Sequence, residues 1–198
     1  MNDSSEHGMP SKANDDYLIP LLNDAAELST AHSRLRTGQR GRQWGLGALN
    51  RAVVVMCVSA WEAYIDELVK EALGSFRPPG HGIGVWQCLN ANARTQTGRF
   101  NNPNVENTRK IIKDTLGLED VTVSWSWQNN TPDRARERLK EALRYRHEVA
   151  HGVNPRPTIH NQYSERLPGF FRQLGHCTDR AVRGYLVDDL GVANPWPR

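Results

Sequence analysis

The sequence predicts an all-α fold, an antiparallel bundle of four to five helices. Apolar residues recur at helical spacing through most of the chain, and prolines and glycines separate the periodic segments. Alternation typical of a strand appears only over residues 121–127 (VTVSWSW). Because a lone strand would leave its edge unpaired, we expect those residues to form an extended loop that packs its tryptophans.

The first two predicted helices are long. One covers residues 15–35, where Pro20 could kink the opening turns. The other covers residues 44–76 and is the most apolar segment of the chain, so we expect it at the centre of the core. Residues 80–84 (GHGIG) then form a flexible turn. We assign this turn no chemistry, because it lacks the strand and helix that flank a phosphate-binding glycine loop.

Three further helices complete the predicted bundle. A short one lies within residues 101–117 and is closed by a glycine. The next starts at residues 130–133 (NTPD), which provide a capping side chain, a first-turn proline and an early acid. It runs to about His151, and the last helix covers residues 162–190.

Length and composition indicate one domain with loose ends. The opening residues are almost all polar, so we expect a disordered tail over residues 1–14, a helical domain over residues 15–190 and a C-terminal tail over residues 191–198.

The longest apolar run, residues 52–60, is far shorter than the ~20 residues that span a bilayer. The 3 scattered cysteines cannot build a disulfide framework. We therefore expect a cytoplasmic protein that does not enter a membrane.

The most informative stretch is LRYRHEVAHG, residues 143–152, because it matches two unrelated chemical patterns. Residues 147–151 spell H-E-x-x-H, which on a helix places two imidazoles one turn apart for zinc, with a glutamate as general base. The extended form of that motif would have a glycine and a histidine where Asn154 and Pro157 stand. A zinc hydrolase therefore remains the weaker alternative.

A zinc site in this chain would also need a third protein ligand. Glu165 and Asp179 are the remaining candidates, and no spacing argument supports either. We expect no metal and no cofactor.

The same stretch begins with Arg146 and ends with His151, and it resembles the Arg-x4-6-His signature of the HEPN superfamily. A polar residue directly after the arginine is typical of that signature, and His147 fills this place. Residues 59–68 (SAWEAYIDEL) are similar to the second-helix pattern of the RiboL-PSP branch. Residues 80–127 carry no pattern of the family that we recognise.

The resemblance implies an antiparallel helical bundle, a homodimer and, in active members, a metal-independent endoribonuclease. It also suggests a toxin or phage-defence effector that acts on RNA, with an antitoxin or another operon protein as a partner. The alternative from another class is a non-catalytic HEPN domain that binds RNA or a protein.

The residue types at this site suit the cleavage of RNA. RNA carries its own nucleophile, the 2′-hydroxyl, so cleavage requires proton transfer and stabilisation of an anionic phosphorus centre. Arginine offers a fixed fork of donors to phosphate oxygens, and histidine exchanges protons near neutral pH. Arg146 continues the apolar stripe of Leu139 and Leu143, where a charge is costly unless it is paired or faces a cleft. We take Glu62 as the candidate for pairing with Arg146 or orienting it.

Helical geometry limits how these groups can meet. On a straight helix, five residues separate Arg146 from His151 by about 140°, so both would not face one phosphate. Either the helix ends between them, or two chains of a twofold dimer share the site, and His147 could join it. The same residues also allow a structural role, in which Arg146 pairs with Glu62 or Glu148 and His151 benefits from the helix dipole.

Overall fold

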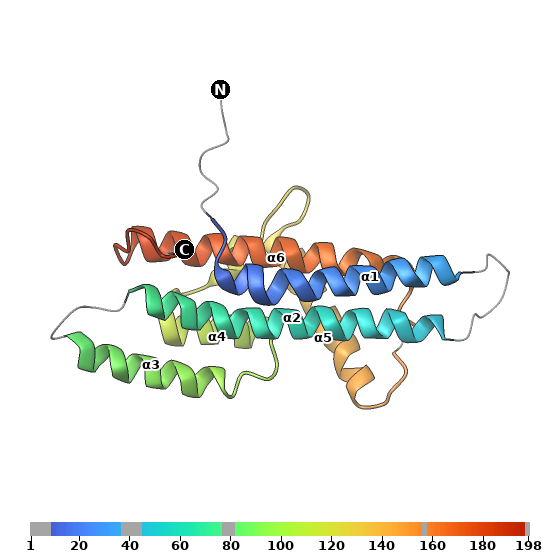
Figure 1. Cartoon of the computed structure of the whole chain (residues 1–198), viewed down its shortest axis with the longest axis horizontal. Coiled ribbons are helices and arrows are strands. Elements are labelled where there is room, and N and C mark those ends of the chain that lie inside the picture. The colour runs from blue at the N-terminus through green and yellow to red at the C-terminus, as the bar shows by residue number, and fades with distance from the viewer. Residues whose placement is uncertain (1–8, 37–44, 77–81, 156–157, 197–198) are drawn as a thin grey trace, which may run out of the picture.

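The computed structural model describes residues 9–36, 45–76, 82–155 and 158–196. These residues form six α-helices and two short helical turns (Figure 1). In chain order the elements are η1 (Asn14–Leu18), α1 (Ile19–Leu35), α2 (Leu46–Ser75), α3 (Ile83–Thr97), α4 (Val105–Leu116), η3 (Val121–Ser124), α5 (Pro132–Ala150) and α6 (Asn161–Asp188). No β-sheet forms within the described ranges, which contain one isolated bridge. The predicted all-α fold is therefore confirmed.

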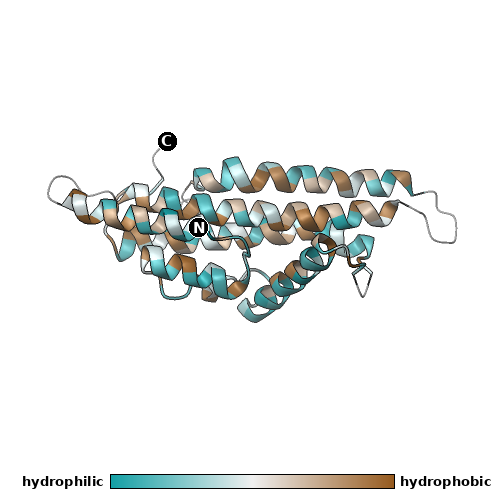
Figure 2. Cartoon of the chain, turned by 90° about the horizontal axis from the view of Figure 1, so that it is seen from below, coloured by the Kyte–Doolittle hydropathy of each residue, from teal (hydrophilic) through white to brown (hydrophobic). Residues whose placement is uncertain are grey.

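Three long helices form the centre of the bundle. α1 runs antiparallel to α2 and α6, and these three helices pack against one another (Figure 1). α4 and α5 contact α2 from outside this group. Hydrophobic and hydrophilic residues both occur along each long helix, as Figure 2 shows, which is the pattern of helices with one face in the core. Among the described helices, none is both long and apolar enough to cross a membrane.

An aromatic cluster fills the core around α2. The ring of Trp61 lies 6.0 Å from that of Trp125 and 6.2 Å from that of Phe171, measured between centroids. The buried indole of Trp61 donates to the Pro103 carbonyl at 3.2 Å. The buried indole of Trp125 donates to the Thr178 hydroxyl at 2.9 Å. These hydrogen bonds avoid the penalty of an unsatisfied buried donor, and they fix the segments before α4 and around η3 against the core.

The end of α4 and the start of α5 follow the signals read from the sequence. The Thr131 side chain accepts a hydrogen bond from the backbone N–H of Arg134, and a proline occupies the first turn of α5. Gly117 ends α4 with a φ of 91°. A Cβ at this position would come within 2.8 Å of the Tyr185 hydroxyl. Glycine is therefore required both by the backbone conformation and by the space available.

One helix was not predicted. Ile83 begins α3, where we expected a flexible turn over residues 80–84, of which residues 80 and 81 lie outside the described part. The indole of Trp86 anchors α3 by donating to the Leu73 carbonyl of α2 at 3.1 Å. α3 buries only two of its residues, so its sequence shows little helical periodicity.

The segment over residues 121–127 is not the extended loop that we expected. Its first half forms η3, a 3-10 turn, and Asp120 caps this turn by accepting from the Thr122 N–H at 2.9 Å. The packing of the tryptophans is confirmed: Trp125 is fully buried, and Trp127 packs against the core from a partly buried position. A single turn of helix satisfies the backbone that a lone strand would leave unpaired.

We expected a disordered tail over residues 1–14, of which residues 1–8 lie outside the described part of the chain. For the last part of this range the prediction is wrong. Ser11 is buried, and both its backbone N–H, at 2.8 Å, and its hydroxyl donate to the carboxylate of Asp179 on α6. Asp179 also accepts a hydrogen bond from the Tyr64 hydroxyl at 3.3 Å. At the other end, Trp196 is buried in the core although it falls in the expected C-terminal tail. The packed domain thus extends beyond both of the limits inferred from polarity.

The buried Asp179 carboxyl should make stability depend on pH. Burial raises the pKa of Asp179 to about 6, against the opposing effect of the hydrogen bonds from Ser11 and Tyr64. The folded chain therefore holds this proton more tightly than the unfolded chain, so the stabilisation is present at low pH and is lost as the pH rises through about 6. Between about pH 4 and pH 7, the free energy of unfolding of the natural chain should fall relative to that of Asp179→Asn by up to about 3 kcal/mol.

Chemical denaturation of both chains at several pH values measures this difference. Asp188→Asn, which changes an exposed carboxylate near the end of the same helix, serves as the control. A difference between the natural chain and Asp179→Asn that stays constant with pH would contradict the prediction.

Candidate functional site

The motif residues lie at the C-terminal end of α5. The helix ends at Ala150, and His151 is its C-cap, with its backbone N–H donated to the His147 carbonyl at 3.0 Å. Gly152 follows with a φ of 71°, a conformation that turns the chain away from the helix axis. The helix thus ends between Arg146 and His151, which is one of the two arrangements that the helical geometry required.

His147 and His151 form a pair on the surface. Their ring centroids lie 4.2 Å apart at an interplanar angle of 55°, and both residues are exposed. Within the described part of the chain, neither ring contacts the guanidinium of Arg146 through a hydrogen bond or a stacking interaction. The structure therefore brings the two histidines together and places the arginine beside them on another side of the helix.

Arg146 faces α2, where it meets Glu62. Its Nη2 lies 3.6 Å from Oε2 of Glu62, and the two side chains are 31% and 27% exposed, respectively. This distance is that of an ion pair rather than of a strong hydrogen bond. The pairing with Glu62 that we inferred is seen, whereas Glu148 pairs with Arg144 at 2.8 Å instead. The guanidinium is thus held from one side and remains partly accessible from the other.

The environment of Glu62 raises the pKa of its carboxyl. Burial raises the pKa of this carboxyl, the charge of Arg146 opposes the rise, and Asp66 raises the pKa further. Asp66 lies one turn after Glu62 on α2 and forms an ion pair with Lys70 at 2.9 Å. Asp66 was not expected at the site from the sequence, although its spacing of four residues from Glu62 places both on one face of α2.

The H-E-x-x-H reading finds no third ligand in the described residues, which contain no cluster of three His, Cys, Asp or Glu side chains suited to a metal. Glu165 accepts hydrogen bonds from Ser33 and Asn161. Asp179 is occupied by Ser11 and Tyr64 in the core. Glu148, the general base of the zinc hypothesis, is bound by Arg144. Within the described part of the chain, the two imidazoles thus have no third metal ligand beside them.

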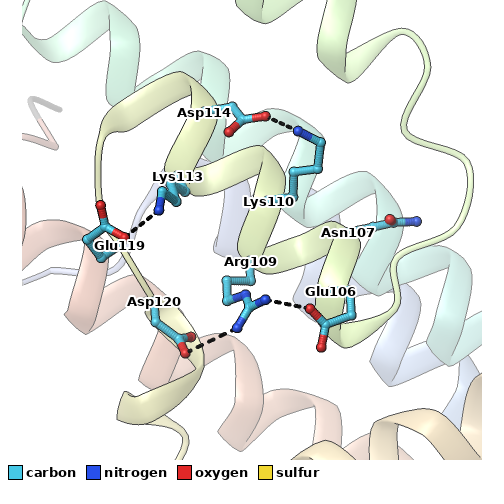
Figure 3. Close-up of a pocket in the computed structure, with 8 residues that line it drawn as sticks. All are labelled: Glu106, Asn107, Arg109, Lys110, Lys113, Asp114, Glu119 and Asp120. Carbon is cyan, nitrogen blue, oxygen red and sulfur yellow. Dashed lines mark hydrogen bonds and ion pairs between the residues drawn. The ribbon is translucent and has the colours of Figure 1, made fainter.

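A separate pocket of about 470 Å³ lies beside α4 (Figure 3). Its cations face carboxylates: Arg109 lies 2.7 Å from Glu106, Lys113 lies 2.5 Å from Glu119, and Lys110 pairs with Asp114. Since the charges of these pairs cancel locally, the pocket has little attraction for a phosphate or another anion. It does not compete with the α5 terminus as a candidate site for RNA chemistry.

The partial exposure of the Arg146–Glu62 pair leads to a testable expectation. Solvent screening should leave a coupling energy of roughly 0.2–1 kcal/mol in a double-mutant cycle of Arg146→Ala and Glu62→Ala. Denaturant unfolding of the four chains measures it. A coupling of about 3 kcal/mol or more would show a buried structural ion pair and would contradict the view that the arginine is available to a ligand.

Comparison with known proteins places these residues in a family. The model of the RiboL-PSP-HEPN family matches residues 20–183, a range that includes α2, the α5 terminus and the region over residues 80–127 in which we recognised no family pattern. The search of curated proteins and the search of solved structures found no match. On the strength of the family match, which covers most of the sequence and both elements of the candidate site, this chain belongs to the RiboL-PSP-HEPN family.

Proposed function

We propose that this chain is a metal-independent endoribonuclease that cleaves RNA at the α5 terminus. HEPN domains are generally nucleases or otherwise act on RNA, and the family match supports the same class here. The observation that carries the proposal is the placement of Arg146, supported by Glu62, at the same helix end as the exposed pair of His147 and His151. This end of α5 combines an anion-binding fork with two groups that transfer protons.

The proposed reaction uses the nucleophile of the substrate. The 2′-oxygen forms a bond to the adjacent phosphorus while the bond from phosphorus to the 5′-oxygen of the next nucleotide breaks. An imidazole takes the proton of the 2′-hydroxyl, and an imidazolium gives a proton to the departing 5′-oxygen. Arg146 donates to the phosphate oxygens, whose negative charge grows in the transition state. The products carry a 2′,3′-cyclic phosphate and a 5′-hydroxyl.

We assign the roles within this site as follows. His151 transfers a proton at the reacting oxygens, and His147, 4.2 Å away between ring centroids, is positioned to take the second proton-transfer role. Glu62 is a positioning residue, because it contacts Arg146 from α2 as an ion-pair partner.

We also propose that two chains share the site in a twofold dimer. Arg146 is directed toward α2, whereas His147 in the last turn of α5 and His151 at its C-cap are exposed. A facing copy of the chain would bring its own arginine and histidines to the groups that lie on different sides of one helix. A role as a cytoplasmic toxin or phage-defence effector, restrained by an antitoxin or operon partner, is the setting that we propose for this activity.

Substitutions at the motif should abolish cleavage while leaving the fold intact. His151→Ala should lower the rate by roughly 10²-fold to 10⁴-fold. Arg146→Ala should lower it by at least ~10²-fold. Arg146→Lys keeps the charge but loses the planar fork, so it should be nearly as damaging as alanine. Gel assays on single-stranded RNA, with mass analysis of the product ends, measure both the rate and the predicted 2′,3′-cyclic phosphate.

His176→Ala is the matched control, because His176 is an exposed histidine on α6 away from the motif. It should cleave at the rate of the natural chain, and a substrate without 2′-hydroxyls should resist every variant. Normal cleavage by a chain lacking both Arg146 and His151 would refute the catalytic proposal and leave a non-catalytic RNA-binding or interaction domain.

Cleavage should persist after exhaustive chelation of metals. The proposed proton transfers use only imidazoles and the substrate, and the described residues offer no third ligand beside the histidine pair. The measurement is the cleavage rate with and without a chelator, together with metal analysis of the purified protein. Stoichiometric zinc, with activity lost on chelation and restored by zinc, would favour the H-E-x-x-H hydrolase instead.

A further inference from the structure

A second hollow, of about 400 Å³, lies between α5 and the first turns of α6. Its lining residues are Arg138, Glu141, His160, Gln162, Tyr163 and Arg166. Neither the motif nor the family pattern that we recognised includes Arg138 or Arg166. The hollow therefore needs its own interpretation.

Neither arginine of the hollow forms an ion pair with a carboxylate of the described residues. Within the described residues, no carboxylate lies within ion-pair distance of Arg138 or Arg166, and Glu141 is the only acid in the lining. The guanidinium of Arg138 is instead held by protein: it lies 4.7 Å above the Phe170 ring centroid and donates to the Arg166 carbonyl at 3.3 Å. A guanidinium fixed in this way is prepared to bind an anion with little further loss of side-chain freedom.

The hollow contrasts with the pocket beside α4 in Figure 3, where ion pairs cancel the charge of the cations. Burial lowers the pKa of Arg138, Tyr163 and Glu141 oppose this effect, and the neighbouring charge of Arg166 adds to it. The positive charges of Arg138 and Arg166 are therefore close enough to repel each other. Binding of a phosphate between them would relieve that repulsion.

The hollow is connected to the proposed catalytic end of α5. Tyr163 in its lining packs edge-on against Tyr145, with 5.2 Å between ring centroids, and Tyr145 immediately precedes Arg146. Arg138 precedes Arg146 on the same helix by a little over two turns, which corresponds to ~12 Å along the axis. The hydroxyl of Tyr163 is buried and has no hydrogen-bond partner among the described residues. Because Arg138 and Arg146 are ~12 Å apart along the axis, a strand of a few nucleotides can reach from the hollow to Arg146.

We propose that this hollow is a second phosphate site, which holds the RNA backbone a few nucleotides away from the phosphate that is cleaved at Arg146. The inference rests on the proposed function, which it extends from the scissile phosphate to the binding of the strand. Arg138 and Arg166 bind the backbone phosphate, which carries no sequence information. The site therefore sets the position of the strand on α5 rather than the choice of bases.

Binding of an RNA that cannot be cleaved tests this site separately from catalysis. The probe is a short fluorescent single-stranded RNA with 2′-O-methyl groups throughout, titrated by anisotropy at several salt concentrations. Arg166→Ala should weaken binding roughly fivefold and lower the salt dependence, expressed as the slope of log K against log salt, by roughly 0.7. Arg180→Ala, which removes an exposed arginine of the same helix outside the hollow, should change neither quantity.

Arg138→Lys keeps the charge in the hollow but loses the planar stack on Phe170, so it should weaken the same probe without removing a charge. Binding by Arg166→Ala that equals that of the natural chain would overturn the inference, as would an equal loss in Arg180→Ala or no binding of the probe by the natural chain. Cleavage by the natural chain with no effect of Arg166→Ala on probe binding would refute the second site alone. An Arg166-dependent binding of the probe, without any cleavage of natural RNA, would refute the nuclease proposal alone.

Discussion

The burial of α2 is the constraint on which the rest of the structure depends. Between Val53 and Leu73, this helix is covered by α1, α6, α4 and α5 and leaves only one side partly exposed. An unpaired charge inside such a core would be destabilising, so the acids of α2 lie on the exposed side. Glu62 and Asp66 are on this side, and α5 crosses there and meets Glu62 through Arg146. The packing of one apolar helix thus determines where an arginine of another helix is held.

The distribution of charge, rather than its total, distinguishes the surfaces of this protein. A formal net charge of +3 indicates little about its partners. Beside α4 the cations are neutralised by neighbouring carboxylates, whereas Glu141 is the single acid among the described residues that line the hollow of Arg138 and Arg166. The surface that we propose for the RNA backbone runs along α5 and the start of α6, where neither Arg138 nor Arg166 forms an ion pair within the described part of the chain.

Most of the fold could be predicted from the sequence, because the buried face of a long amphipathic helix appears as a periodic pattern of apolar residues. The cap at Thr131 and the closing Gly117 were also readable, since each depends on local backbone chemistry. The sequence did not reveal α3, or the attachment of Ser11 to Asp179 on α6. α3 buries too few residues to show a helical pattern. The contact between Ser11 and Asp179 joins segments that are distant along the chain, and local composition does not indicate such contacts.

For the site, the sequence by itself determined the residue types and their order: an arginine, a histidine next to it, and a second histidine one turn later at a predicted helix end. It also named Glu62 as a partner for Arg146, because a charge in an apolar stripe must be compensated. Only the tertiary structure decided between Glu62 and Glu148 as the partner of Arg146, and only the tertiary structure brought Arg138 and Arg166 into one hollow. Those outcomes depend on how α2, α5 and α6 cross, and interhelical geometry is set by packing in three dimensions rather than by spacing along one helix.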